Sequence, residues 1–478
     1  MLGPGISSES MWTPFEATTT ASVRELRWSL NISWLRNEDA GAGFAIVDAS
    51  VIGGTDFIKG LAGTVTNADI YEHTDETARV VALRYSRSLP EPSGGISTCL
   101  MDVTLQNTDR VLSPNIDPTI GTAILPKRPI NAHIGFYVNS RQMTVPVFKG
   151  LTKMPRENKG TRLVHITSQD YISYLQGVPM EAAKYVSQRS DVIIASILSD
   201  LGFGSSQYEL DTGLNTIGFA YFEKGVSAGY RIKKICEAEE ALFYQDEEGI
   251  LRFENRRHYS VVPHTESQIM LEEDDIIAWQ QDESTPIINK VVVKAKPLVI
   301  RSNQDVWQSA EEVEIASGAT AEVWANFIDP VNEITDPAET TDYTAFTGTG
   351  GTGSNISSDI DTTITKFVTA AKLEITNNNV SKAYVNLLKL RGTPATSVDT
   401  SGKSSQILEV YEDANSINKY DEHEYTIEND FIDSSTFASY LAEAIVTKYK
   451  DPMKRVRITV RGIPHLQLRD KITIRGVE

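Results

Sequence analysis

Hydrophobic and polar residues alternate with a period of two near the start of the chain. The alternating hydrophobic residues of LRWSLNISWL are Leu26, Trp28, Leu30, Ile32 and Trp34. This period places them on one face of a half-buried strand. Further strand-like segments lie at 78–86, 97–107, 132–138, 143–151 and 161–170, separated by the turn-forming stretches PEPSGG, SPNIDP and RENKG. Many short strands at this spacing predict a β-barrel or sandwich.

The pattern changes to a helical period between residues 178 and 272. Ser190 precedes DVIIASILSDL as a helix N-cap, and Gly202 follows as a stop. A second helix begins near Ser227, with hydrophobic residues at helical spacing through Cys236. LFYQDEEGILRF then indicates a strand, a tight polar turn and a strand. These elements predict a small α/β module.

The strand pattern returns from Ile276, in IIAWQQ and INKVVVKAKP. Residues 306–404 are rich in Thr, Ser, Asn and Gly, and their strand-like stretches AEVWANFI, AAKLEITNN and KAYVNLLKL predict an inserted β-sandwich. After EYTIEND, Ser434 or Ser435 caps the helix STFASYLAEAIVTKYK, which has one apolar face and ends before Pro452. The strands RVRITVRG and KITIRG close the chain.

The predicted fold class is therefore mainly β with α+β modules. We expect two β-barrel-like domains, a small α/β module and an inserted β-sandwich. The predicted divisions are an N-terminal arm (1–23), a first barrel-like domain (24–177), the α/β module (178–272), a second barrel-like domain in two pieces (273–305 and 405–478) and the insertion (306–404).

Composition narrows the classes of function. The 478 residues carry a net charge of −19, which disfavours general nucleic-acid binding because that requires a basic surface. MLGPGISSESMWTPFEATTT lacks the basic and apolar regions of a signal peptide, and no apolar run reaches the length of a membrane span. Cys99 and Cys236 are the only cysteines, which indicates two free thiols in a reducing compartment.

One acidic stretch raises the question of catalysis or metal binding. EAEEALFYQDEEGILRFENRRHY holds Glu237, Glu239, Glu240, Asp246, Glu247, Glu248 and Glu254, followed by Arg256, Arg257 and His258. The helical phase and the Gly249 turn distribute these acids over a helix surface and a turn tip, where we expect them to stay in water. We therefore interpret the stretch as structural, with no catalytic residue assigned.

Other candidate chemistry is no more specific. The histidines lack paired metal-ligand spacing, and we interpret them as surface or loop residues: His73, His133, His165, His258, His264, His423 and His465. The acidic stretches at 272–275, 336–343 and 358–363 do not follow calcium-loop spacing. TGTGGTGSN opens no helix and indicates a flexible loop rather than a phosphate cradle. We predict no catalytic, cofactor or metal residues, and binding residues stay undefined.

The order of these elements resembles the first barrel of tail hub proteins, the tail-tip or baseplate hub components of tailed bacteriophages. The resemblance is carried by a run of an arginine, a proline, small residues, an apolar strand and a Ser-Pro pair. The matching residues here are Arg87, Pro90, Gly94, Gly95, Leu105, Asn107, Ser113 and Pro114, followed by Phe148, Gly150, Asp170 and Leu175.

The second half is similar to the same family. ICEAEEALFYQDEEGILRFENRRHY fits a helix followed by a hairpin with an acidic turn. The later motifs match Pro286, Asn289, Val291, Val293, Gly462, Pro464, Leu466 and Asp470. Arg469 stands where the family has a glycine. The resemblance covers about residues 24–478 and consists of strands and turns rather than a signature motif.

The resemblance implies a structural, non-enzymatic hub at the virion tail tip, made in the host cytoplasm and without cofactor. Such hubs are trimers whose barrel-like domains surround a channel for DNA passage. Expected partners are the tail tube or distal tail protein, the tape measure and receptor-binding or fibre proteins, without specific nucleic-acid binding and without a membrane span.

Two other functions stay open from the residues alone. One is a tail-associated cell-wall hydrolase or endopeptidase, although the chain ends at ITIRGVE and leaves little room for such a domain. The other is a carbohydrate-binding adhesin, in which Trp307 and Trp324 stack on sugars instead of packing in a core or at an edge.

Overall fold

The computed structural model describes residues 26–36, 71–90, 94–113, 116, 124–138, 141–262, 264–281, 286–398 and 402–476. Strands dominate these residues and a few helices join them, which confirms the mainly-β class with α+β modules. The predicted N-terminal arm and Pro114 lie outside the described residues. The division into domains stays a prediction, so the sheets are described one by one.

The first sheet is built from the early alternating segments. Seven strands pair in the order β2-β1-β6-β7-β9-β5-β3, and β8 pairs with β9. Their bounds are β2 (Tyr71–Asp75), β1 (Leu26–Arg36), β6 (Pro129–Val138), β7 (Arg141–Thr152), β9 (Leu163–Gln169), β5 (Cys99–Gln106), β3 (Val80–Arg87) and β8 (Arg156–Asn158). Leu30, Ile32 and Trp34 are fully buried, as their alternation predicts, whereas Trp28 is partly exposed.

The predicted α/β module contains the helices α4 and α5 and short strands, and the helix α3 directly precedes it. The elements are α3 (Tyr171–Leu175), β10 (Ala183–Arg189), α4 (Ser190–Asp200), β11 (Tyr208–Leu210), β12 (Thr216–Phe222), α5 (Ala228–Glu237), β13 (Leu242–Gln245) and β14 (Leu251–Glu254). Ser227 caps α5 as predicted, because its side chain accepts a hydrogen bond from Tyr230 N. Ser190 is the first residue of α4 instead of its N-cap, a position that Arg189 takes.

A strand from the first half of the chain enters the sheet of this module. The two-residue strand β4 (Gly95–Ile96) pairs in parallel with β13, which itself pairs with β14 in an antiparallel hairpin. Gly94 has a positive φ of 72°, and a Cβ there would lie 2.5 Å from the carbonyl oxygen of Ala241. Glycine is therefore required where the two backbones approach.

The later strands form separate small sheets. β17 (Lys290–Ala295) lies between β28 (Ile407–Glu412) and β29 (Glu424–Glu428), and α7 (Ser435–Tyr449) packs on this sheet. α6 (Ala414–Tyr420) connects β28 to β29. Two further pairs are β15 (Ile269–Leu271) with β31 (Ile472–Ile474), and β16 (Ile276–Gln281) with β30 (Val456–Val460). Ser434 caps α7, as the sequence predicts.

The predicted insertion and the residues just before it, from β18 onward, form two sheets around one core. β27 (Ala383–Thr396) pairs with β18 (Val299–Ile300), β19 (Gln304–Gln308), β20 (Val313–Ile315), β22 (Val331–Ile334) and β23 (Tyr343–Gly348), and β23 also pairs with β24 (Thr352–Asn355). The second sheet has the order β21 (Thr320–Asn326), β26 (Ala370–Asn377), β25 (Ile360–Lys366). Leu373 and Ile375 of one sheet share the core with Val385 and Leu390 of the other.

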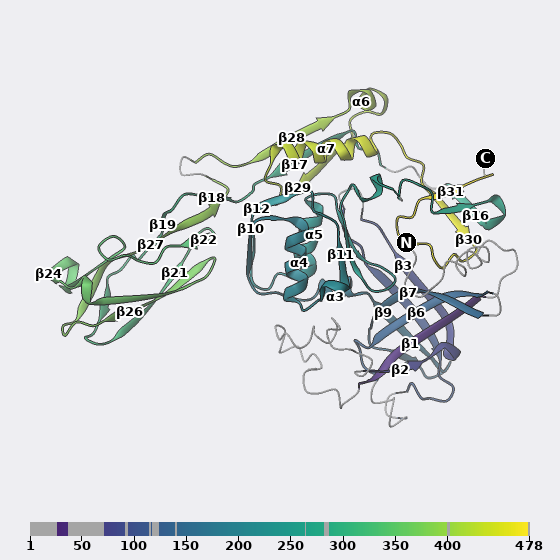
Figure 1. Cartoon of the computed structure of the whole chain (residues 1–478), viewed down its shortest axis with the longest axis horizontal. Helices are drawn as coiled ribbons and strands as arrows, with labels where there is room; N and C mark the ends of the chain where they lie inside the picture. Colours follow the sequence, from purple (N-terminus) through teal and green to yellow (C-terminus); the bar gives the residue numbers. More distant parts are fainter. Residues whose placement is uncertain are drawn as a thin grey trace.

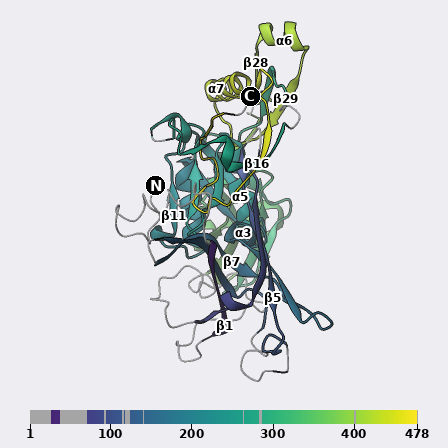
Figure 2. The same ribbon diagram turned by 90° about the vertical axis from the view of Figure 1, so that its right-hand side faces the viewer.

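The arrangement of these parts is extended. Figure 1 shows the insertion, with β21, β26 and β24, projecting to one side, while the first sheet lies on the far side of the α/β module. In the perpendicular view, α6 and β28 stand at one end of the molecule and β1 and β5 at the other (Figure 2). No helix within the described ranges combines the length and apolar character needed to cross a membrane.

Candidate functional site

The acidic stretch at 237–259 is buried to a large extent, so the expectation that its acids stay in water is wrong. Glu239, Asp246, Glu247 and Glu254 are all 9% exposed or less. The helix α5 ends at Glu237, and Glu240 then adopts a φ of 57° in the left-handed region that terminates many helices. The chain therefore reverses at once into β13, and the acids lie against neighbouring segments.

Glu239 joins three segments through one oxygen. Its Oε2 accepts hydrogen bonds from the backbone N–H groups of Leu214 (2.9 Å) and Asn215 (2.7 Å) and from Ser190 Oγ (3.1 Å). Burial raises the pKa of Glu239 to about 7, although these hydrogen bonds act to lower it. Asn215 Nδ2 donates to the carbonyl oxygen of Phe431 at 2.9 Å, which links the loop to the segment after β29.

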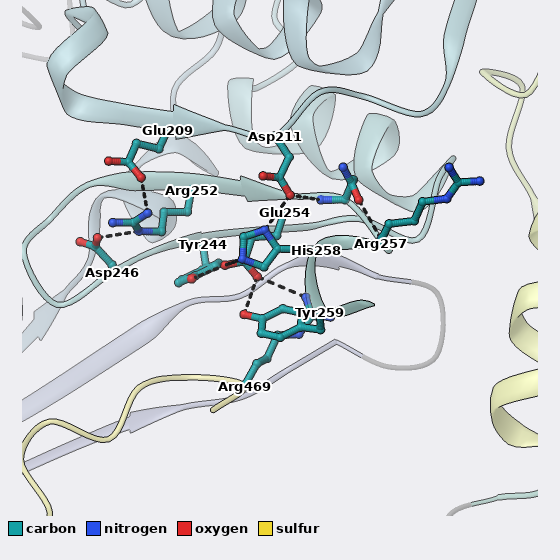
Figure 3. A network of polar contacts seen from close by, with 11 residues as sticks. Glu209, Asp211, Tyr244, Asp246, Arg252, Glu254, Arg257, His258, Tyr259 and Arg469 are labelled. Atoms are coloured by element: carbon teal, nitrogen blue, oxygen red, sulfur yellow. Dashed lines mark hydrogen bonds and ion pairs between the residues drawn. The ribbon is translucent and has the colours of Figure 1, made fainter. Parts of the chain in front are cut away.

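Glu254 is the centre of a second cluster, shown in Figure 3. Its Oε1 accepts from Tyr244 OH at 2.7 Å, and its Oε2 accepts from Tyr259 OH at 2.8 Å. Arg469 Nη1 lies 3.3 Å from Oε2, and its guanidinium carbon lies 3.9 Å from the centre of the Tyr259 ring. Glu254 therefore attaches the carboxyl-terminal segment to the hairpin.

Arg469 replaces the glycine of the hub pattern, and the structure explains how it is accommodated. Its φ is 70°, a value that glycine adopts readily and other residues rarely adopt. The turn is closed by Asp470, whose Oδ2 accepts a hydrogen bond from Gln467 N at 2.7 Å. The backbone of the glycine-type turn is kept, while the guanidinium gains an ionic contact with Glu254.

His258, which the sequence places on the surface or in a loop, lies in the turn after β14 and also takes part in this network. Its Nδ1 lies 2.8 Å from Asp211 Oδ2, and this hydrogen bond raises the pKa of His258. Its Nε2 lies 3.6 Å from Glu254 Oε1, and its ring packs on the rings of Tyr259 and His264. His258 therefore connects β14 to the loop that follows β11.

The hairpin tip is held by Asp246. Asp246 Oδ1 accepts hydrogen bonds from the backbone N–H groups of Glu248 (3.0 Å) and Ile250 (2.8 Å), and its Oδ2 accepts from Arg252 Nε at 2.7 Å. Arg252 also pairs with Glu209 of β11. An aspartate that satisfies its own turn in this way fixes the reversal of the chain.

Glu247 connects the hairpin tip to the first sheet. It pairs with Arg87 of β3, and the two side chains are only 11% and 10% exposed. Burial raises the pKa of Glu247, and the charge of Arg87 opposes that rise. Nearby, Gln245 Nε2 donates to the carbonyl oxygen of Lys149 in β7 at 2.8 Å.

A cavity of 280 Å³ lies at the meeting point of these segments. It is lined by residues from the loop after β3, the α/β module, α7 and the carboxyl-terminal segment: Leu89, Pro90, Gly94, Glu240, Leu242, Arg256, Tyr259, Ser260, Ala444, Lys448 and Arg469. Lys448 Nζ lies 3.7 Å from Glu240 Oε1, and Arg256 Nη1 donates to the carbonyl oxygen of Glu239 at 3.3 Å. Charged groups on its walls are therefore engaged by the protein itself, Lys448 by Glu240 and Arg256 by a backbone carbonyl.

The arrangement of these acids fits contacts that hold segments together better than it fits catalysis or metal binding. A glycosidase needs two carboxylates that face a substrate across a cleft, but Glu239, Glu247 and Glu254 are each engaged by groups of the protein itself. Within the described residues, no three His, Cys, Asp or Glu side chains gather as metal ligands. A buried ion pair adds little net stability, because the cost of removing both charges from water offsets their attraction.

The other acidic stretches also serve local structure. Asp342 accepts hydrogen bonds from Arg391 Nε (2.7 Å) and from Ala338 N (2.9 Å). In 358–363, Asp359 and Asp361 accept from the amides of Asn379 and Asn378. In 272–275, Asp275 Oδ2 accepts from Glu272 N at 3.1 Å and closes a single turn.

The structure also places the glycine-rich stretch, the two cysteines and the two tryptophans considered above. TGTGGTGSN forms the β23–β24 hairpin, in which Gly350 and Gly351 take positive φ values. Cys99 and Cys236 are buried and unbonded to each other. Of the two tryptophans considered for sugar stacking, Trp307 packs against the core of the insertion, whereas Trp324 is exposed.

Sequence reasoning missed Arg231, a fully buried cation of α5. Its Nη2 donates to the carbonyl oxygens of Glu181 (2.7 Å) and Glu223 (3.1 Å), and its guanidinium lies over the Phe222 ring at 5.2 Å. The helical spacing could have predicted this burial. Arg231 precedes Ile235 by four residues and therefore lies on the same buried face of the helix.

Comparison with known proteins gives structural matches only. No family model matches the chain, and no curated protein matches it. A prophage MuSo2 43 kDa tail protein from Shewanella oneidensis is similar at 11% identity and a TM-score of 0.33, over 46% of this chain and 62% of that one. A tail protein from Neisseria meningitidis is similar at 13% identity and a TM-score of 0.32, over 47% and 61%.

A third match is longer. Prophage tail protein gp18 from Listeria monocytogenes is similar at 7% identity and a TM-score of 0.37, over 82% of this chain and 79% of that one. By contrast, the match covers less than two thirds of the length of the Shewanella and Neisseria proteins. These proteins are what the chain is similar to in structure, and no residue role is transferred from them.

Proposed function

We propose that this chain is a non-enzymatic structural hub of a phage tail tip or baseplate, assembled as a ring of identical copies. The observation that supports the proposal is a two-stranded sheet with exposed apolar side chains among the described residues. It is the ribbon formed by β16 and β30, defined here as residues 276–281 and 456–460.

The ribbon has the features of an interface rather than of a finished sheet. Within the described part of the chain, β16 and β30 pair only with each other. Ile277 is 64% exposed and Trp279 is 42% exposed. An isolated two-stranded ribbon is marginally stable in water, and exposed apolar groups beside open strand edges favour association. A second protein surface that covers the ribbon would stabilise its two strands and bury its exposed apolar side chains.

A second strand edge with exposed side chains lies elsewhere on the same chain. β3 stands at one end of the first sheet, and its Val81 and Tyr85 are exposed. Two different surfaces that fit each other produce a head-to-tail contact, and such contacts close into rings when the rotation allows it. In this proposal the ribbon of one copy packs against β3 of the next, and three copies form the ring that the family resemblance implies.

The charge of the chain fits a channel that DNA crosses. A net charge of −19 would repel the phosphate backbone, so DNA could pass through the ring without being retained. The proposed neighbours are the tail tube or distal tail protein, the tape measure and receptor-binding or fibre proteins. The ring would adapt the tube to these distal parts.

The oligomeric state in solution tests the proposal. Light scattering coupled to size exclusion should give about three times the chain mass of 52.8 kDa for the wild type. Ile277→Lys on the ribbon and Val81→Lys on β3 should each shift the protein to the monomer, because a buried lysine without a partner is strongly unfavourable. Val380→Lys is the matched control, since Val380 is 92% exposed in the insertion.

A wild type that stays monomeric at high concentration would contradict the ring. A trimer that survives both Ile277→Lys and Val81→Lys would contradict the assigned surfaces. Circular dichroism of each variant distinguishes loss of assembly from loss of folding.

A further inference from the structure

The outer face of the three-stranded sheet in the insertion is polar, with one large aromatic side chain. Along β26, Ala371, Leu373 and Ile375 are buried, and the residues between them point the other way. The strand register places the outward residues side by side: Thr320, Glu322, Trp324, Lys372, Glu374, Thr376, Asp361, Thr363 and Thr365. We call this set the outer face of the insertion.

Trp324 is held in position although it is 51% exposed. Its ring and that of Phe367, which is 49% exposed, lie 6.0 Å apart between centroids with planes only 16° from parallel. The indole Nε1 donates to Glu322 Oε1 at 3.3 Å. Fixing an exposed aromatic ring before a ligand arrives reduces the entropy lost on binding.

The polar groups beside Trp324 are fixed as well. Lys372 Nζ lies 3.0 Å from Glu322 Oε2 and 3.0 Å from Glu374 Oε1, so it bridges the two carboxylates. Thr320 Oγ1 and Thr376 Oγ1 lie 2.9 Å apart on the same face. The face therefore combines oriented carboxylate acceptors with hydroxyls that both donate and accept.

We propose that the outer face of the insertion binds a neutral polysaccharide. The C–H-rich side of a sugar ring packs on an exposed aromatic ring, and its hydroxyls need donors and acceptors at close spacing. Trp324 supplies the aromatic ring, and Glu322, Glu374 and the threonines supply the hydrogen-bonding groups. This inference goes beyond the proposed hub function and does not depend on it.

Other ligands fit this face less well. The centres of protein interfaces are depleted of charged residues, whereas Glu322, Lys372 and Glu374 stand in the middle of this face. Nucleic acids and anionic polymers would meet an excess of carboxylates over cations. A neutral, hydroxyl-rich chain is not repelled by the carboxylates and can form hydrogen bonds with the charged groups at the centre of the face.

The position of the insertion suits this role. It projects away from the first sheet and the α/β module (Figure 1). The ribbon and the β3 edge lie outside the insertion, so the proposed contacts between copies leave the outer face free. A ring of three copies would carry three such faces, and their combined avidity could far exceed the affinity of one.

Binding of the full chain to an array of neutral oligosaccharides tests the inference, followed by affinity electrophoresis in gels that contain the best neutral polysaccharide. The wild type should be retarded. Trp324→Ala should weaken binding by about tenfold or more, given the usual contribution of aromatic contacts, and Trp324→Phe should restore part of it. Glu322→Gln should also weaken binding.

Trp28→Ala is the matched control, because Trp28 is an exposed strand tryptophan of the first sheet. It should bind as the wild type does. The inference is overturned if no neutral glycan is bound, if only acidic glycans or proteins are captured, or if Trp324→Ala binds unchanged. Thermal melts of all variants confirm that they fold, and light scattering shows separately whether the ring persists.

Discussion

At the residue scale, the buried acids of the 237–259 stretch are stabilised by different kinds of partner. Glu239 relies on backbone N–H groups and a hydroxyl, Glu254 on two tyrosines and an arginine, and Glu247 on an arginine from another sheet. These differences give each acid a separate and measurable effect on folding.

Glu239 should make stability depend on pH. Its pKa in the folded protein is about 7, above the usual value of a glutamate, so the folded state binds the proton more tightly than the unfolded state. The stabilisation is complete near pH 4 and is lost as the pH rises through 7. Glu239→Gln should flatten this part of the pH profile, which amounts to roughly 3 kcal/mol at most.

Urea unfolding of wild type and Glu239→Gln between pH 5 and pH 8 measures this effect. Glu237→Gln is the control, because Glu237 lies on the outer part of the same helix end and pairs with Lys233 and Lys234. It should keep the wild-type slope. Equal slopes for Glu239→Gln and wild type would contradict the assignment.

The two neighbouring glutamates of the hairpin tip should behave differently. Glu247→Gln leaves the buried Arg87 without a counter-charge and should lower the free energy of unfolding by about 2 to 3 kcal/mol. Glu248→Gln should have an effect within about 0.5 kcal/mol, because Glu248 contributes only its backbone N–H to the turn. Equal losses at both positions in urea titrations would refute this distinction.

At the element scale, close approach between strands explains one of two glycines of the hub pattern. A Cβ on Gly150 in β7 would lie 2.3 Å from the carbonyl oxygen of Gln169 in β9. Gly462, which belongs to the same pattern, has open space around its Cβ position. One glycine is therefore required for strand packing, and the other is free to change.

Substitution by alanine should affect stability differently at Gly150 and at Gly462. Gly150→Ala should destabilise the chain by about 1 to 3 kcal/mol, because two backbones must move apart. Gly462→Ala should leave the melting temperature nearly unchanged. Differential scanning calorimetry of both variants checks this, and a larger loss at Gly462 than at Gly150 would show that the strand packing is wrong.

Local periodicity predicted the elements that depend on local sequence. The alternation in β1 and the caps of α5 and α7 were readable because burial repeats within a few residues. The burial of Glu247 was not readable, because its partner Arg87 lies far away in the chain. The short strand β4 was missed for the same reason, since its pairing with β13 is set by the meeting of two distant segments.

At the scale of the whole molecule, the polar network and the incomplete ribbon have complementary roles. The network fixes how the first sheet, the α/β module and the carboxyl-terminal segment meet within one chain. Within the described residues the ribbon strands pair only with each other and β3 ends its sheet, and in the proposed ring these edges would join one chain to the next. The proposed ring would use both features, the network within each copy and the strand edges between copies.

Cryo-electron microscopy of the tailed particles that contain this chain tests the central claim most directly. The account predicts three copies around the tail axis at the distal end, with the ribbon of each copy against β3 of its neighbour and the insertions pointing outward. Absence of the chain from the tail, or its presence there as single copies without contact between ribbon and β3, would contradict the account.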